Sequence, residues 1–149
     1  MTLENLLAIH RLQAFEPTPA SVQRLLASAG RNLADARLPE LSNDNRFDAA
    51  YKTIMQCAMI GLWAKGFRTA TSQPGHHQTA LQTLPKTLEL DADTVIVLDA
   101  LRKQRNLNDY EGDPVTDAAV RECQAQAEAL LAHTRHWLQD HRPDLLSEN

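Results

Sequence analysis

Residues 47–63 carry apolar side chains on almost every side of a helix. One stripe recurs every three or four positions, at Phe47, Ala50, Tyr51, Ile54, Met55, Ala58 and Leu62. Three further apolar residues, Met59, Ile60 and Trp63, widen this stripe in the second half of the segment. A helix that is apolar nearly all round must be covered on all sides, by other helices of a bundle or by a second chain. The segment therefore predicts a central helix.

Helical spacing and stop signals divide the rest of the chain into further helices. The pattern predicts two short helices, residues 2–13 and 76–84, and three more long ones, about residues 19–33, 91–111 and 114–141. Thr18 followed by Pro19 is typical of a helix start, and the final residues 142–149 are expected to fray. Because no strand-like alternation is present, we expect an all-α, antiparallel up-and-down bundle of four main and two shorter helices. It forms one domain, residues 1–149, with its core at about 20–140.

Composition and charge narrow the possible classes of protein. A chain of 149 residues with 43% hydrophobic residues can bury one core without disulfides or metals. The net charge of −4 gives no support for a protein that binds nucleic acid or membranes non-specifically through an overall positive charge. No signal peptide or membrane-spanning segment is evident, and the two cysteines, Cys57 and Cys123, have no metal-type spacing. We expect a cytoplasmic protein with two reduced, buried thiols.

The sequence "LRKQRNLNDYEG", residues 101–112, concentrates basic residues in this acidic chain. On a helix, Arg102, Arg105, Asn106 and Asp109 share one face because they lie three or four positions apart. A structural role explains the stretch as a helix end, with an Arg105–Asp109 ion pair, basic residues favoured by the helix dipole, and a terminating Gly112. A functional role would make the same face a binding site.

An arginine, a polar residue and then a histidine or tyrosine near a helix end form a pattern that resembles the HEPN domain family. Arg105 matches the motif arginine of that family and Asn106 the polar residue beside it. The helical composition, the chain length and the preceding segment "PGHHQTAL" are also similar to small prokaryotic HEPN proteins. The resemblance covers about residues 20–140.

The resemblance implies a homodimer whose motif residues from both chains line one cleft. Active members of the family cleave RNA without a metal, and several are toxins paired with a small nucleotidyltransferase antitoxin. In some members the transferase attaches a nucleotide to a tyrosine near the motif, and Tyr110 is an imperfect counterpart of that residue. A toxin–antitoxin or defence module is therefore the expected context, with a nucleotidyltransferase as a possible partner.

This chain departs from the family pattern at the position of the motif histidine, where Tyr110 stands. Metal-free RNA cleavage needs one group to remove the 2′-hydroxyl proton and another to protonate the leaving oxygen. Histidine, with an ordinary pKa near 6.5, suits this task, whereas tyrosine near 10 does not. Arg105 can bind a phosphate but is too basic to transfer protons. A nuclease would therefore have to recruit His76 or His77 from the preceding segment.

The adjacent His76 and His77 are the other unusual feature. Neighbouring residues on a helix point in different directions, so the pair is not expected to chelate one metal ion. No helical H-x-x-x-H pair and no cysteine pair supports zinc, and we expect neither a metal nor a cofactor. Either ring could contact a phosphate, and either could simply pack or cap a helix. For His133 and His136 on the last helix we expect a solvated face.

These observations lead to three functional hypotheses. The first is a HEPN-like protein with a degenerate motif that binds a nucleotide, RNA or a protein partner. Its predicted ligand-binding residues are Arg102, Arg105, Asn106, Asp109 and Tyr110, with His76 and His77 at the border. The second is a metal-free endoribonuclease that uses Arg105 with a histidine of the GHH segment, His77 being the expected catalytic partner. The third is a dimeric structural scaffold without a ligand.

Overall fold

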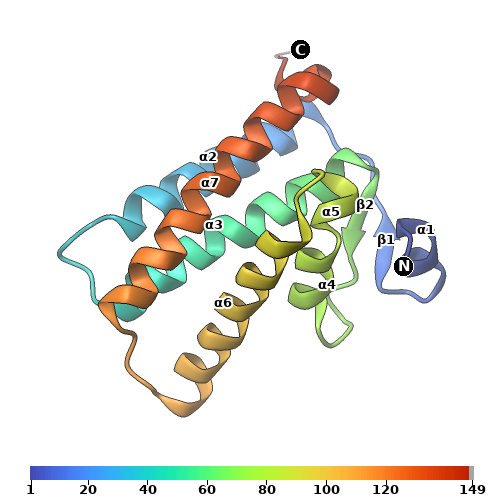
Figure 1. The fold of residues 1–149 in the computed structure, drawn as a ribbon. Helices are drawn as coiled ribbons and strands as arrows, with labels where there is room; N and C mark the ends of the chain where they lie inside the picture. The colour runs from blue at the N-terminus through green and yellow to red at the C-terminus, as the bar shows by residue number, and fades with distance from the viewer. Residues whose placement is uncertain (148–149) are drawn as a thin grey trace.

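The computed structural model describes residues 1–147 and is predominantly helical, which confirms the all-α class. Its elements in chain order are α1 (Leu3–Ala8), β1 (Leu12–Ala14), α2 (Pro19–Ala36), α3 (Asn43–Ala64), β2 (Phe67–Thr69), α4 (His76–Gln82), α5 (Leu84–Thr87), α6 (Ala92–Glu111), α7 (Asp117–His141) and the 3-10 helix η1 (Pro143–Leu146). The four long helices α2, α3, α6 and α7 run alternately up and down (Figure 1). No helix in this part of the chain has both the length and the apolar character that a bilayer span requires.

Helix α3 is the centre of the fold, as its sequence predicts. It packs against α2 and α7 on one side and against α4, α5 and α6 on the other (Figure 1). The side chains that this packing buries include Phe47, Ala50, Ile54, Cys57, Ala58, Ile60 and Leu62. A single chain therefore covers most of the apolar segment, and the breadth of that segment no longer argues for a second copy. The expected homodimer then depends on the family resemblance alone.

Side-chain caps start α2, α3 and α6 where the sequence predicts, whereas α7 starts at Asp117, three residues later than predicted. The hydroxyl of Thr18 accepts a hydrogen bond from the backbone N–H of Ser21 at 3.0 Å, and Pro19 occupies the first turn of α2. Ser42, Asp91 and Thr116 cap α3, α6 and α7 in the same way. Gly112 follows α6 in the left-handed region, at φ 71°.

The N-terminal segment differs from the predicted helix over residues 2–13. Helix α1 ends at Ala8, and His10 adopts a left-handed φ of 63°, which a continuing helix does not allow. The chain then forms β1, which pairs antiparallel with β2 and buries Leu12. The expectation that the chain contains no strand is therefore wrong, although each strand spans only three residues.

The C-terminal segment is ordered by specific contacts rather than frayed. Leu145 is buried, and the amide of Gln23 donates to its carbonyl oxygen at 3.3 Å. Arg142 donates to the carbonyl oxygen of Ala64 at the end of α3 and to the carboxylate of Asp144. The prediction of fraying is wrong for residues 142–147, and its remainder, residues 148–149, lies outside the described residues.

Helix α6 differs from its predicted packing in its second half. It buries Leu98 and Leu101, but Leu107, which the apolar spacing of residues 91–111 predicts to face inward with them, is 45% exposed. The helix contacts α3, α4 and α5, and its two buried residues both lie in its first half. Residues 107 and 109–111, near the end of the helix, are exposed on the surface.

Candidate functional site

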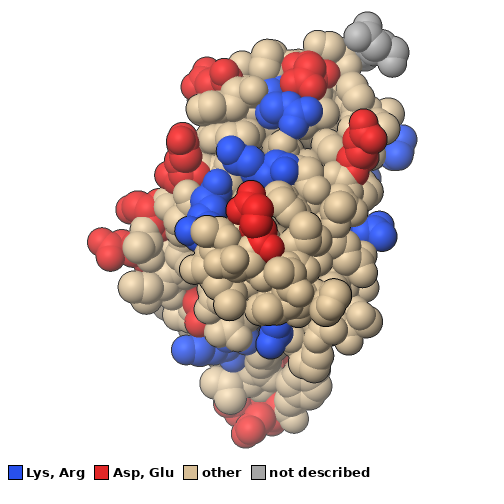
Figure 2. Space-filling model, turned by 90° about the vertical axis from the view of Figure 1, so that its right-hand side faces the viewer, with Lys and Arg blue, Asp and Glu red and all other residues tan. Residues whose placement is uncertain are grey.

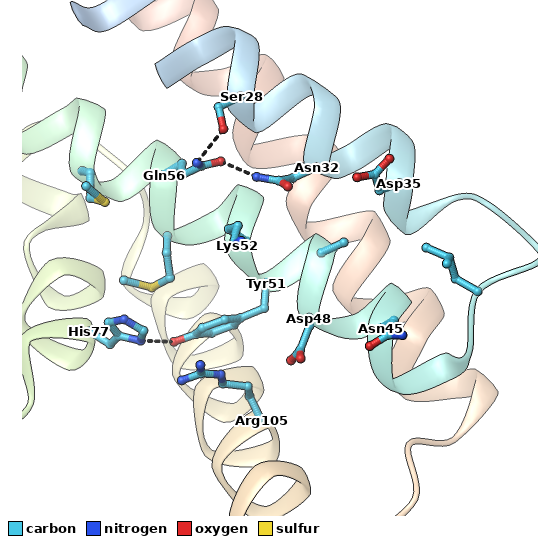
Figure 3. A pocket seen from close by; sticks show the side chains of 14 residues that line it. Ser28, Asn32, Asp35, Asn45, Asp48, Tyr51, Lys52, Gln56, His77 and Arg105 are labelled. Carbon is cyan, nitrogen blue, oxygen red and sulfur yellow. Dashed lines mark hydrogen bonds between the residues drawn. The ribbon is translucent and has the colours of Figure 1, made fainter. Parts of the chain in front are cut away.

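A groove of about 900 Å³ runs along a polar stripe of α3, between α2 and α6 (Figure 3). Helix α2 contributes Ser28, Asn32 and Asp35, and α4 and α6 contribute one residue each, His77 and Arg105. The floor is formed by α3, which contributes both polar and apolar lining residues: Asn45, Asp48, Ala49, Tyr51, Lys52, Met55, Gln56 and Met59. The groove therefore combines hydrogen-bonding groups with an apolar floor.

Three side chains from three helices meet at one side of this groove, and we call Tyr51, His77 and Arg105 the Tyr51 cluster. The hydroxyl of Tyr51 and Nδ1 of His77 form a hydrogen bond at 3.2 Å. The guanidinium carbon of Arg105 lies 5.4 Å from the centroid of the Tyr51 ring, a cation–π contact. Figure 3 shows the guanidinium of Arg105 near the hydroxyl end of the Tyr51 ring, which is also where His77 lies. The predicted residues Arg105 and His77 are thus joined through a tyrosine.

The guanidinium of Arg105 is oriented by its neighbours and retains free donors. Its Nε lies 3.1 Å from a carboxylate oxygen of Asp109, one helical turn further along α6. Within residues 1–147 its two terminal amino groups have no hydrogen-bond partner. The side chain of Arg105 lines the groove and is about one third exposed, so the guanidinium can serve as a donor group of the groove. Its two amino groups provide the paired donors that bind a phosphate or a carboxylate.

Burial keeps both titratable rings of the Tyr51 cluster neutral. Desolvation is the main cause that lowers the pKa of His77 from 6.5 to about 4, and the nearby charges of His76, Arg105 and Arg102 lower it further. Burial likewise raises the pKa of Tyr51 to about 12, although Arg105 and Arg102 oppose that shift. At neutral pH neither ring can exchange a proton easily.

Carboxylates make the groove electrically mixed rather than basic. Burial raises the pKa of Asp48 above its ordinary value, the charge of Asp109 raises it further, and Arg105 opposes both effects. Asp35 and Lys52 add one charge of each sign to the lining. On the face shown in Figure 2, basic and acidic side chains are likewise interspersed. The Arg105 side of the groove is therefore the part that suits an anionic group.

The other predicted site residues on α6 lie outside this groove. Arg102 donates from Nε to Asp99 at 2.8 Å, and Lys103 lies 3.5 Å from the same carboxylate. Asn106 is partly buried but is not part of the lining, and Tyr110 is 84% exposed near the end of the helix. The structure therefore separates Tyr110 from the Tyr51 cluster.

The two histidines of the GHH segment have different surroundings. His76 packs edge-on against His77, with ring centroids 4.7 Å apart, while His77 alone lines the groove. On α7, His133 lies with Nε2 2.6 Å from the carbonyl oxygen of Leu88, so the expected solvated face holds for His136 but not for His133. No three His, Cys, Asp or Glu side chains gather closely enough to hold a metal ion anywhere in residues 1–147.

Sequence reasoning missed the contribution of α3 to the site. Tyr51 was assigned to the buried stripe, and it is indeed only 3% exposed, but its hydroxyl reaches the groove. Asp48, Lys52 and Gln56 recur every four positions, a polar stripe on an otherwise apolar helix that could have located the groove. Gln56 is fixed there, donating to the hydroxyl of Ser28 at 2.9 Å.

The fold and this groove define the class of protein that can be assigned: an all-α bundle with a polar groove along its central helix. No family model matches the chain, and no curated protein or solved structure shows significant similarity to it. The function is therefore inferred from the geometry and chemistry of the groove, together with the resemblance of the Arg105 motif.

Proposed function

We propose that this chain is a HEPN-like protein that binds a nucleotide or a short RNA through the Tyr51 cluster, without efficient cleavage. The observation that carries this proposal is the free pair of amino groups on Arg105, held beside the Tyr51 hydroxyl and His77 at a groove of about 900 Å³. A planar guanidinium next to neutral hydrogen-bonding groups is well suited to a phosphate.

The pKa values of the Tyr51 cluster favour binding over catalysis. Cleavage at a 2′-hydroxyl needs a base and an acid whose pKa values lie near the working pH. His77, with a pKa of about 4, is neutral at pH 7 but a weak base, and Tyr51, with a pKa of about 12, is a weak acid. Arg105 remains the group with strong affinity for a phosphodiester.

The charges of the lining favour a short ligand over a long nucleic acid. Asp35 of α2 and Asp48 of α3 line the part of the groove that lies along the N-terminal half of α3. Their negative charges would repel a polyanion there. The lining on the other side of the Tyr51 cluster contains Met55, Gln56 and Met59, without a carboxylate. A short strand bound at Arg105 would therefore extend towards Met59.

A metal-free ribonuclease is the second candidate, and one observation favours it. His77 and Arg105 both contact Tyr51, so a histidine lies near the arginine. A nuclease that lacks the motif histidine would require such a neighbouring histidine. In such an enzyme His77 would accept the proton of the 2′-hydroxyl and Arg105 would stabilise the negative charge at phosphorus. Cleavage in the presence of EDTA that His77→Gln abolishes would establish this candidate.

The expected partners follow from the family resemblance. We propose a homodimer in a toxin–antitoxin or defence module, with a nucleotidyltransferase as the cognate partner. Light scattering after gel filtration measures the oligomeric state directly. A dimer that binds neither RNA nor nucleotide in any assay would instead support the structural scaffold.

Binding of fluorescein-labelled hexauridine and of AMP tests the proposal. We expect Arg105→Ala to weaken binding about tenfold or more, because a charge-assisted phosphate contact is lost. Lys103→Ala is the matched control, since Lys103 is an exposed basic residue of the same helix that does not line the groove. Added salt should weaken binding by the wild type. Equal affinities of Arg105→Ala and wild type would refute the proposal.

A further inference from the structure

A second, smaller cleft lies next to the groove, at the C-terminal end of α3. Its volume is about 220 Å³, and its lining comprises Phe15, Met59, Trp63, Arg68, Thr69 and Thr71. Met59 lines both the larger groove and this cleft, so the two are neighbours along α3. The cleft is small, aromatic and free of carboxylates.

The aromatic wall of this cleft is built by two separate parts of the chain. Phe15 follows β1 and Trp63 lies in the last turn of α3, with ring centroids 4.9 Å apart and planes inclined at 40°. The backbone N–H of Phe15 donates to the carbonyl oxygen of Gly66 at 2.9 Å, which fixes the residue beside α3. Both rings remain partly exposed, although each is large and apolar. Such a pair is a platform on which a further ring can stack.

A cation lies at the rim of the same cleft. The guanidinium carbon of Arg68 is 5.5 Å from the centroid of Phe15, and its Nε donates to the amide oxygen of Gln13 at 3.1 Å. No ion pair neutralises Arg68 among the described residues. An aromatic platform, a guanidinium and the nearby hydroxyl groups of Thr69 and Thr71 together match the features by which proteins bind unpaired nucleobases.

We propose that this cleft is a subsite for one unpaired base of a short single-stranded RNA whose phosphate lies at Arg105. The inference rests on the proposed function, because the strand must first be bound at the Tyr51 cluster. From Tyr51 to Trp63 the helix rises about 18 Å. That distance exceeds one nucleotide and corresponds to about five stacked nucleotides, or fewer in an extended strand. The site therefore selects an oligonucleotide over a mononucleotide.

Fluorescence of Trp63 tests the subsite. Trp137→Phe leaves Trp63 as the single tryptophan, since the chain has two. In this background we expect saturable quenching by hexauridine or hexaadenosine and none by an abasic ribose-phosphate hexamer. The abasic hexamer and the Trp63→Leu variant, which keeps an apolar side chain, should each bind about tenfold more weakly because base stacking is lost. AMP should bind with the same affinity to Trp63→Leu and to wild type.

The outcomes separate this inference from the proposed function. If hexauridine binding requires Arg105 but is the same for Trp63→Leu and for the abasic hexamer, the base subsite is wrong and the proposed function stands. If neither hexamer nor AMP binds wild type, the proposed function fails and the subsite fails with it. Saturable quenching of Trp63 by an aromatic tripeptide, with none by oligonucleotides, would assign the cleft to a protein partner instead.

Discussion

Acidification should destabilise the fold through His77. Burial and nearby positive charges lower the pKa of this ring from 6.5 to about 4, so protonation is less favourable in the native state than in the unfolded chain. Between these two pKa values the unfolded state binds more protons, and the free energy of unfolding must fall as the pH falls. The contribution of His77 to the free energy of unfolding is therefore fully present above pH 6.5 and is lost progressively as the pH falls to about 4.

The size of the effect follows from the two pKa values. One pKa unit corresponds to about 1.4 kcal/mol, so the full shift would amount to about 3 kcal/mol below both values. The His77 ring is only partly buried at the edge of the groove, and solvent screening reduces this figure. We expect the free energy of unfolding to fall by about 1–2 kcal/mol between pH 7 and pH 4.5 through this residue.

Urea unfolding followed by circular dichroism at pH 7 and pH 4.5 measures this contribution. His77→Gln should lose it, while His136→Gln, which removes an exposed histidine of α7, should behave like wild type. The raised pKa of Asp48 acts in the opposite direction and is common to all three proteins, so it cancels in the comparison. The same pH dependence in His77→Gln and in wild type would refute the assignment, as would an NMR titration of His77 with a midpoint near 6.5.

Two further predictions concern the core. Gly61→Ala should lower the free energy of unfolding by about 1–3 kcal/mol, because the new Cβ would lie 2.7 Å from the Thr87 hydroxyl oxygen. Gly30→Ala should instead raise the free energy of unfolding by about 0.5–1 kcal/mol through helix propensity, since the nearest atom to its new Cβ is 3.5 Å away. Equal urea midpoints for the two variants would contradict this contrast. Burial raises the pKa values of Cys57 and Cys123 to about 12, so a thiol reagent at pH 8 should label them only as fast as the protein unfolds, and rapid labelling without urea would be inconsistent with this burial.

The fold could be predicted from the sequence where a single strong pattern determined it. The apolar breadth of α3 requires a central position, and Thr18 with Pro19 marks a helix start by local chemistry alone. The strands could not be predicted, because three residues are too few to show alternation and their pairing joins Leu12 to the distant Thr69. Leu107 was misplaced because helical spacing cannot tell where a neighbouring helix stops covering a face.

The candidate site was only partly predictable for a related reason. Arg105 and His77 were identified by residue type, but the tyrosine that joins them was not. The ring of Tyr51 follows the spacing of the core, and spacing alone does not show that its hydroxyl lies at a polar groove. A side chain with a buried body and a hydrogen-bonding end satisfies both environments, so its pattern resembles that of phenylalanine.

The burial that builds the Tyr51 cluster also determines what the cluster can do. Desolvation keeps Tyr51 and His77 uncharged, so they can donate or accept hydrogen bonds without transferring a proton at neutral pH. The charge that remains for a ligand is that of Arg105, oriented by the Tyr51 ring and by Asp109. Tyr110 lies outside the groove, so even a histidine at that position would not supply the missing proton transfer within one chain. Binding at Arg105 requires only the groove of a single chain, whereas cleavage would also require His77 to accept a proton despite its lowered pKa.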